Sequence, residues 1–420
     1  MLRALGYSVR LFDKRDLSRK ASNLRSINLA VSTRAWTALR QVGLEEKIKD
    51  ISVAMKGRML HIQDGTQYFQ AYGKEEQAIY SVPRNDLNHL LLQEAKKKGV
   101  EIVDQHELDY IDNQKAYFKN GAIEGLENGL IIGADGIHSA VRKASQAEKG
   151  KEHNLGYQYI EFDMSPNTNG NWKMEPNALH IWPRRAFMMI ALPNGDGSFT
   201  CTMFLPEKGE NSFSALRYGS SIRDFFSTHF QDFTALVPDF EVQFDQHPIS
   251  ELSYLSGVEP FDGRLLLVGD AAHAIVPFYG QGMNAGFEDA RLLAELLTND
   301  FSIEDLKSFA ADRMENGKAI MELALQNFVE MRDEVLNPVF QTRKKIEKEI
   351  AKRYEGEWKS QYALVTFSNT PYAEAQETGE KWNAFLEELI HRYAITEEQV
   401  QKNAIPEEVW HQIEYFIDQQ

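Results

Sequence analysis

Short apolar runs alternate with amphipathic stretches along the chain, a pattern typical of a mixed α/β protein. Residues 265–268 form an apolar run stopped by Gly269, which predicts a buried parallel strand. A helical pattern follows from about Met283 to Leu297. A second apolar run, residues 130–132, leads to the sequence Gly-Ala-Asp-Gly. The two runs predict two buried strands, each of which leads to an aspartate.

Alternating patterns predict further strands. Residues 7–13 alternate and end at Asp13. Residues 57–62 and 67–72 predict a hairpin around an Asp-Gly turn. Three more runs predict antiparallel strands of a separate sheet, of the kind that covers a substrate cavity: residues 178–183, 187–193 and 198–206.

Helical patterns fill much of the remainder. Residues 213–230 are expected to be helical, and residues 241–255 are expected to lead back to the nucleotide domain. Between residues 317 and 336, apolar side chains recur on one helix face with Asn327 in their midst. A buried amide needs hydrogen-bond partners, so Asn327 either ties two elements together or faces a ligand. The highly charged residues 340–354 predict a solvated helix.

Composition excludes several classes of protein. A chain of 420 residues with 43% hydrophobic residues can bury a sizeable core. The net charge of −16 argues against nucleic-acid partners and anionic membranes. The single Cys201 excludes an internal disulfide framework, and the histidines have no metal-like spacing. No run reaches the roughly 18 apolar residues of a membrane anchor, and no signal-peptide core is present, which predicts a cytoplasmic location.

Asp13 is the first candidate for cofactor binding. In a dinucleotide-binding fold, such an acid lies about 20 residues after a glycine fingerprint and faces a ribose. No G-x-G-x-x-G occurs in this chain. We therefore expect the first strand and the phosphate loop to lie before residue 1, with Gly6 as the C-cap of the helix that follows them.

Residues 269–284 form the strongest candidate site. Asp270 is expected at the carboxyl end of a strand, where open α/β sheets bind ligands. Gly280 and Gly282 precede a helix, so backbone N–H groups can approach a polar ligand there. An ordinary strand–loop–helix joint with a capping aspartate is the alternative reading.

These motifs resemble the FAD signatures of the single-component flavoprotein aromatic hydroxylases. The order GD, P, GQGMN is similar to the second FAD signature, and residues 130–142 resemble the Asp-Gly signature, which contacts the pyrophosphate. The resemblance implies FAD as the cofactor. It also implies the following cofactor-binding residues: Asp13, Arg15, Arg84, Asp135, Gly136, Asp270, Pro277, Gly280, Gln281, Gly282, Met283 and Asn284.

Within these hydroxylases the chain most resembles the kynurenine 3-monooxygenases. The segments RSINLA, GRML, HIWP, FMMIALPN, FTCTMFLP, NFVEMR and VTFS carry this resemblance, together with the GD motif. It implies a clamp for an amino-acid substrate formed by Arg58, Tyr72, Asn327 and Tyr362. Phe278 and Met331 are expected to form apolar walls around the ring.

The implied reaction is hydroxylation of L-kynurenine with NADPH and O2, through a flavin C4a-hydroperoxide. It would serve tryptophan degradation or NAD biosynthesis. No side chain is expected to act as a catalytic acid or base, and His273 is expected to be structural. A homodimer remains open. The alternatives are a hydroxylase of another aromatic acid and a truncated, non-catalytic protein that binds metabolites.

The expected fold is α/β, with a Rossmann-like FAD domain, an antiparallel substrate domain and a C-terminal helical region. The FAD domain is expected in three parts, residues 1–55, 84–150 and 256–300. A hairpin at residues 56–83 and a sheet at residues 151–255 are expected to form the substrate domain, and residues 301–420 the helical region.

Overall fold

A computed structural model describes most of the chain. The described residues are 1–17, 28–73, 76–112, 114–126, 129–219, 221–332 and 337–419. Residues 25–27 of the RSINLA segment and position 335 of the predicted helix stripe lie outside them.

Two sets of parallel strands form the core of the portion that is expected to bind the nucleotide, called the nucleotide-binding portion below. Strand β1 (Arg10–Phe12) pairs with β7 (Glu101–Val103). Strand β11 (Ile131–Gly133) pairs in parallel with β18 (Leu265–Leu267), and β17 (Phe261–Asp262) runs antiparallel beside β18. The prediction of a buried parallel strand at residues 265–268 is therefore confirmed. Because β11 and β18 are adjacent, the aspartates that follow them lie at one edge of the sheet.

Helices and small sheets surround these strands. The 3-10 helix η1 (Leu2–Leu5) ends at Gly6, whose φ of 93° makes it a left-handed C-cap, as predicted. The other helices of this portion are α1 (Thr33–Gln41), α2 (Glu45–Lys49), α3 (Arg84–Lys97), α4 (Ala140–Ala144), α9 (Asp270–His273), η2 (Pro277–Tyr279) and α10 (Gly282–Leu296). The small sheets are β2 (Leu29–Val31), β6 (Ile79–Val82) and β3 (Val53–Met55), and β10 (Ile123–Gly125), β9 (Lys115–Phe118) and β8 (Leu108–Asp112).

A seven-stranded sheet forms the second portion, in the order β16-β12-β15-β14-β13-β4-β5. Its strands are β4 (Gly57–His61), β5 (Gln67–Ala71), β12 (Lys149–Met164), β13 (Ala178–Pro183), β14 (Met188–Pro193), β15 (Phe199–Pro206) and β16 (Ser250–Val258). The three predicted antiparallel strands are confirmed as β13, β14 and β15. The hairpin β4–β5 is also confirmed, and β4 joins the sheet through a parallel pairing with β13.

Four short helices cover one face of this sheet with a phenylalanine-rich core. They are α5 (Phe213–Tyr218), α6 (Ile222–His229), α7 (Gln231–Leu236) and α8 (Phe240–Gln246). The prediction that residues 213–230 are helical is confirmed, and they form two helices because Ser221 caps the second one. The predicted return at residues 241–255 was wrong in part, since β16 pairs with β12 of this sheet.

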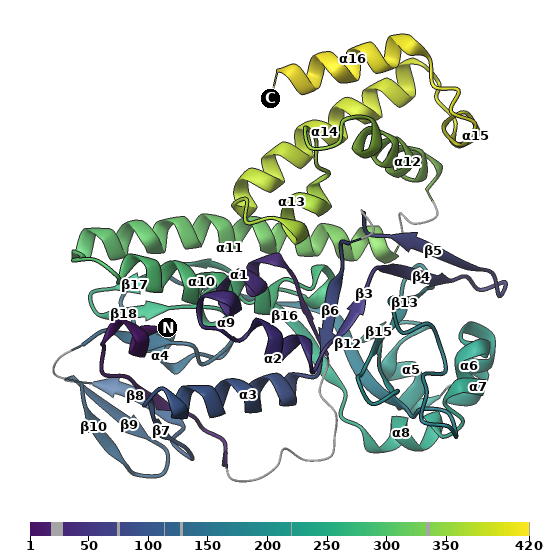
Figure 1. Cartoon of the computed structure of the whole chain (residues 1–420). Helices are drawn as coiled ribbons and strands as arrows, with labels where there is room; N and C mark the ends of the chain where they lie inside the picture. The colour runs from purple at the N-terminus through teal and green to yellow at the C-terminus, as the bar shows by residue number, and fades with distance from the viewer. Residues whose placement is uncertain are drawn as a thin grey trace.

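The C-terminal region is helical, as predicted. It consists of α11 (Ile303–Arg332), α12 (Pro338–Arg353), α13 (Gln361–Phe367), α14 (Tyr372–Arg392), α15 (Glu397–Gln401) and α16 (Glu407–Asp418). The long helix α11 lies between the nucleotide-binding portion and helices α13–α16 (Figure 1). No helix in the described part of the chain combines the length and apolar character needed to cross a bilayer.

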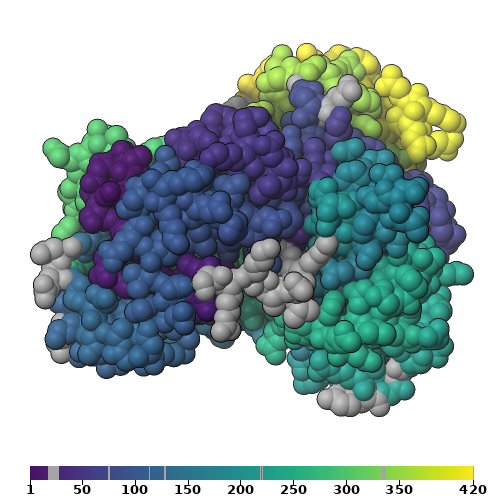
Figure 2. Space-filling view, turned by 60° about the horizontal axis from the view of Figure 1, so that its bottom comes forward, coloured from purple at the N-terminus to yellow at the C-terminus, as the bar shows by residue number. Residues whose placement is uncertain are grey.

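Helix α12 contradicts the prediction of a solvated surface. Ile346 and Ile350 are buried in a core with residues of α14 and α16. Arg343 and Glu347, at positions i and i+4 of the same helix, are also buried. Because the buried face of α12 includes charged residues, the sequence pattern did not reveal it. Figure 2 shows residues 84–126 in blue and residues 157–250 in teal to green as two lobes of the surface, with the C-terminal helices at one edge.

Candidate active site

The turn after β18 presents Asp270 to solvent. Gly269 adopts a φ of 57°, and its backbone N–H donates to the carboxylate of Asp289 at 2.7 Å. Asp270 begins α9 and is exposed, and no described residue donates a hydrogen bond to it. Its Oδ1 lies 3.8 Å from the place where a Cβ on Gly282 would stand. The carboxylate therefore faces the glycine-containing loop that precedes α10.

The loop from Pro277 to Gly282 is built for a close backbone approach. Pro277 begins η2, and Gly280 ends it with a left-handed φ of 68°. A Cβ on Gly280 would lie 3.3 Å from the Cβ of Ala30, so a side chain there would be both strained and crowded. Helix α10 then begins without a side-chain cap from the described residues. Its first N–H groups and the positive end of its dipole are available to a polar ligand.

Gln281 and Asn284 have buried side chains that bind protein atoms. Asn284 accepts a hydrogen bond from the N–H of Ser32 at 2.9 Å and donates to the carbonyls of Ala30 and Gly280 at 2.8 Å each. The Gln281 amide oxygen accepts from the hydroxyl of Tyr372 at 2.9 Å. These side chains fix the loop, so a contact with cofactor from this pair would use the backbone.

Met283 is partly buried and packs against a core that includes Trp36 and Leu39 of α1. It anchors the first turn of α10 to α1 from the side of the apolar core. Like the two amides, it therefore contributes to the shape of the loop.

The Asp-Gly motif forms the second turn at the same sheet edge. Asp135 Oδ2 accepts hydrogen bonds from the N–H groups of Ala140 and Val141, at 2.7 and 3.2 Å, and so caps α4. Gly136 has a φ of 80°. Arg142 donates to the carbonyl of Ala271 at 2.9 Å, which ties this motif to α9. The two signatures are thus joined directly.

Asp13 and Arg15 form a local pair at the end of β1. The carboxylate of Asp13 accepts from the backbone and guanidinium of Arg15 at 2.7–3.0 Å. Burial alone would raise the pKa of Asp13, but these hydrogen bonds lower it by a larger amount. The pKa therefore lies below its usual value, and the carboxyl is ionised. Arg84 is exposed at the first turn of α3. Asp13 can therefore accept hydrogen bonds from ribose hydroxyls, and Arg84 offers an exposed cation.

Three of the predicted clamp residues, Arg58, Tyr72 and Tyr362, come together from separate parts of the chain. The guanidinium carbon of Arg58, on β4, lies 5.8 Å from the ring centroid of Tyr72 and 5.0 Å from that of Tyr362, on α13. The two tyrosine rings stack at 5.6 Å. In strand register Arg58 opposes Gln70, so Tyr72 reaches the cluster from just beyond the end of β5.

Tyr279 connects this cluster to the glycine loop. Its ring stacks on Tyr362 at 5.7 Å, and it is the last residue of η2. Tyr279 was not among the residues predicted from the sequence. The signal that could have identified it is an aromatic residue immediately before the first glycine of GQG.

Asn327 joins the same loop from α11. It is buried, and its Nδ2 donates to the carbonyl of Phe278 at 2.7 Å and contacts the sulfur of Met331 at 3.3 Å. Phe278 stacks on Phe328 at 4.3 Å and packs on Phe204 of β15 at 5.0 Å. Asn327 thus ties two elements together, and it does so beside an apolar wall.

Two buried polar atoms of the cluster have no hydrogen-bond partner among the described residues, Arg58 Nε and Tyr72 Oη. Burial lowers the pKa of Arg58, but its contacts with Tyr362 and Tyr72 raise it more, so the guanidinium stays charged. Burial holds the pKa values of Tyr72 and Tyr279 well above their usual range, so both remain neutral hydroxyls. A cation and neutral phenols suit a carboxylate ligand.

The histidines have structural positions. His273 Nε2 lies 2.7 Å from Asp289 Oδ2, within a buried network, as expected. His61 and His180 hydrogen-bond each other at 2.8 Å, and burial lowers the pKa of His180 to about 4. Among the described residues, no group of histidine, cysteine and acidic side chains could hold a metal ion.

Comparison with known proteins places this site in a family. An FAD binding domain family model matches residues 1–324. The kynurenine 3-monooxygenase of Cytophaga hutchinsonii is 43% identical over 400 residues, which cover 92% of this chain and 89% of that protein. The kynurenine 3-monooxygenases of Stenotrophomonas maltophilia and Dictyostelium discoideum are 38% and 37% identical, over 89% and 92% of this chain and 85% and 88% of those proteins.

Solved structures share the fold at lower identity. The tetrameric form of 2-methyl-3-hydroxypyridine-5-carboxylic acid oxygenase has a TM-score of 0.63 at 18% identity, covering 80% of this chain and 89% of that one. Pseudomonas aeruginosa PqsL, in complex with 2-aminobenzoylacetate, has a TM-score of 0.63 at 17% identity, covering 79% and 92%. The family model and the sequence relatives show that the chain belongs to the kynurenine 3-monooxygenase family of FAD-dependent hydroxylases and is a flavoprotein monooxygenase.

Proposed function

We propose that the protein hydroxylates L-kynurenine at carbon 3, with NADPH as reductant and O2 as oxidant. One observation carries the proposal: the Arg58–Tyr72–Tyr362 cluster contacts the loop that begins α10, through the stacking of Tyr279 on Tyr362. A binding site for an amino-acid head group therefore adjoins the expected flavin site. The names of the relatives in the family agree with this substrate.

Arg58 and the tyrosines are suited to the carboxylate of kynurenine. A guanidinium can donate two parallel hydrogen bonds to a carboxylate, and a neutral phenol can add another. Arg58 Nε and Tyr72 Oη are buried without partners among the described residues, a state that costs free energy unless a ligand satisfies it. The carboxylate would supply the missing acceptor.

The aromatic wall is suited to the aniline ring. Phe278 stacks on Phe328 and packs at a tilt against Phe204, and Met331 packs in the same cluster. Asn327 holds the carbonyl of Phe278 and thereby the orientation of this wall. A direct contact between Asn327 and substrate remains a prediction.

FAD would be held along the sheet edge by Asp13, Asp270 and the backbone of residues 280–284. The uncapped start of α10 and the exposed carboxylate of Asp270 fit a ligand that carries both acceptors and hydroxyls. When bound, FAD supplies the redox chemistry, and the oxygen-transfer route expected from the sequence remains a prediction. The protein's part is to hold the ring carbon in place and to exclude water.

The decisive experiment identifies the product. Protein reconstituted with FAD is mixed with NADPH, L-kynurenine and ¹⁸O2, and both NADPH oxidation and product mass are measured. Kynurenine should accelerate NADPH oxidation, and the product should carry one ¹⁸O at carbon 3. Full flavin occupancy with no labelled product would overturn the proposal. Faster hydroxylation of another aromatic acid would favour the alternative hydroxylase.

A truncated substrate separates the clamp from the ring pocket. 2-Aminoacetophenone keeps the aniline and ketone but lacks the carboxylate and ammonium groups. Arg58→Met should raise the apparent dissociation constant for kynurenine and leave that for 2-aminoacetophenone unchanged. Equal effects on both compounds would show that Arg58 shapes the pocket and does not bind the head group.

A further inference from the structure

Tyr372 binds the loop at the start of α10 from outside the nucleotide-binding portion. It is the first residue of α14 and is fully buried. Its hydroxyl donates to the amide oxygen of Gln281 at 2.9 Å. The amide nitrogen of Gln281 has a longer contact, 3.5 Å, with the hydroxyl of Ser32. The Tyr372 bond is therefore the shorter of the two contacts that orient this side chain.

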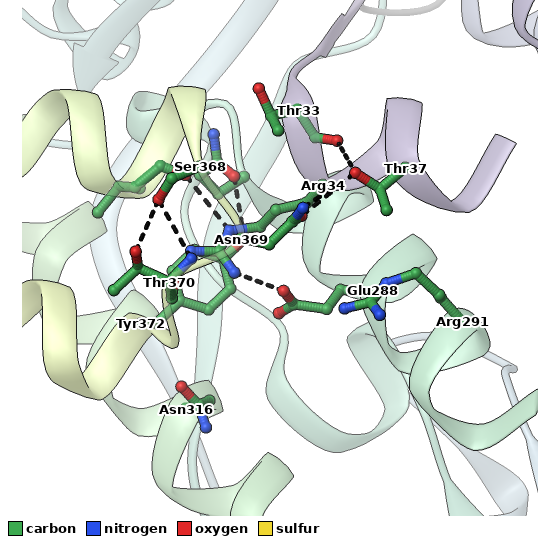
Figure 3. A network of polar contacts seen from close by, with 12 residues as sticks. Thr33, Arg34, Thr37, Glu288, Arg291, Asn316, Ser368, Asn369, Thr370 and Tyr372 are labelled. Carbon is green, nitrogen blue, oxygen red and sulfur yellow. Dashed lines mark hydrogen bonds and ion pairs between the residues drawn. The ribbon is translucent and has the colours of Figure 1, made fainter. Parts of the chain in front are cut away.

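Arg34 holds Tyr372 in place. The guanidinium carbon lies 3.7 Å from the Tyr372 ring centroid, a close cation–π contact between two buried groups. Arg34 also donates to the carbonyls of Val365 and Thr370 and pairs with the carboxylate of Glu288 on α10. Figure 3 shows Arg34 of α1 beside Glu288 of α10 and Thr370 of the segment between α13 and α14, with Tyr372 next to it.

The same contacts determine where α13 stands. Val365 is in α13, one turn from Tyr362, whose ring lies under Arg58 and against Tyr279. Arg34 therefore fixes the helix that carries a clamp residue, while Tyr372 fixes the side chain that precedes α10. The contact between Arg34 and Tyr372 therefore helps to position both the proposed flavin side and the proposed substrate side of the site.

We propose that Tyr372 is a positioning residue, which holds the α10 loop in register with Tyr362 so that flavin and substrate meet in the reactive arrangement. The substrate half of this inference rests on the proposed function. The flavin half rests on membership of the flavoprotein family. Tyr372 itself is separated from the ligands by Gln281 and acts through it.

Removal of the hydroxyl alone isolates this role. Tyr372→Phe keeps the ring and its contact with Arg34, but it leaves the Gln281 oxygen without its donor. The α10 loop can then shift, and a small misplacement of reacting groups costs much more in chemistry than in folding. We expect roughly threefold or more hydrogen peroxide per NADPH consumed, and roughly a threefold weaker affinity for FAD.

The matched control is Tyr393→Phe. Tyr393 follows the other end of α14, and its hydroxyl accepts from Gln412 at 2.8 Å, remote from the α10 loop. Each variant removes one phenol hydroxyl. Peroxide yield, FAD dissociation constant, the visible flavin spectrum and melting temperature are measured for each. Tyr372→Phe should change the first three, and Tyr393→Phe should change none of them.

A double variant tests the path through Gln281. If the bond carries the effect, Tyr372→Phe combined with Gln281→Leu should be no worse in FAD affinity than Gln281→Leu alone. Additive losses would overturn the proposal. So would a Tyr372→Phe protein with a lowered melting temperature but wild-type spectrum, FAD affinity and peroxide yield. If the wild type makes no hydroxylated kynurenine, the proposed function fails, while FAD affinity and the flavin spectrum still decide the role of Tyr372.

Discussion

Replacement of Asp289 by asparagine should destabilise the protein markedly. Asp289 is 1% exposed, and its carboxylate accepts hydrogen bonds from Gly269 N–H at 2.7 Å, His273 Nε2 at 2.7 Å and Arg313 Nε at 2.8 Å. An asparagine has the same shape but no charge, and its NH2 group would face one of these donors. The substitution leaves Arg313 and a protonated His273 less compensated.

Two estimates of the loss agree. Burial raises the pKa of Asp289, but His273 and Arg313 lower it more, from 3.8 to about 2. That difference corresponds to roughly 2–3 kcal/mol of stability, present above pH 4 and lost as pH falls towards 2. Breaking a buried ion pair costs about 3–5 kcal/mol. Arg313 keeps Glu288 at 3.0 Å, so we expect the lower end, about 3 kcal/mol.

Thermal unfolding measures this loss. An unfolding entropy of about 2.1 cal/mol/K per residue makes 3 kcal/mol a shift of roughly 3 °C for a chain of this length. The control is Asp312→Asn, which removes a carboxylate 3.6 Å from the same Arg313 but 57% exposed. It should shift the melting temperature by less than about 1 °C, because exposed pairs contribute little.

The pH dependence gives a second check. Burial lowers the pKa of His273, but Asp289 raises it above 6.5. A raised histidine pKa stabilises the fold fully below pH 6.5, and that contribution is lost as pH rises through the folded-state pKa. Wild type should therefore lose melting temperature between pH 6 and 9 more steeply than Asp289→Asn. Equal melting temperatures at pH 6, or equal slopes, would refute the proposed role of the network.

Three further predictions concern the site. Tyr72→Phe should raise KM for kynurenine roughly three- to tenfold without lowering the melting temperature, since the hydroxyl has no partner among the described residues; a lowered melting temperature with unchanged KM would contradict this. Asp270→Asn should weaken FAD binding roughly tenfold in fluorescence titration, because the exposed carboxylate would lose a charge-assisted bond; unchanged affinity would exclude it from the cofactor site. Gly317→Ala places a Cβ 2.8 Å from that of His273 and should cost about 1–3 kcal/mol in thermal unfolding, whereas a gain would mean that α11 adjusts freely.

Local sequence signals predicted the strands around the candidate site well. The apolar runs stopped by glycine identified β11 and β18, and the alternating pattern identified the hairpin β4–β5. These signals depend on residues within about ten positions of one another. The parallel pairing of β4 with β13 has no such local signal and was not predicted.

The pattern of hydrophobic and polar residues did not predict long-range polar contacts. Arg34 meets Glu288 and Thr370, which lie 254 and 336 residues away in sequence. In α12 the run of charged residues predicts exposure, although Arg343 and Glu347 are buried. The sequence alone does not show whether a charged side chain is surrounded by solvent or packs against another helix. Only the packing of the C-terminal helices decides that.

The most direct test of the account is a spectral titration of the flavin-loaded protein with L-kynurenine. The stacking of Tyr279 on Tyr362 puts the proposed amino-acid clamp beside the proposed flavin loop. Kynurenine should therefore perturb the visible flavin spectrum in a saturable way, and Arg58→Met should require roughly tenfold or more kynurenine for the same change. A wild-type spectrum that does not respond to kynurenine at full flavin occupancy would contradict the account.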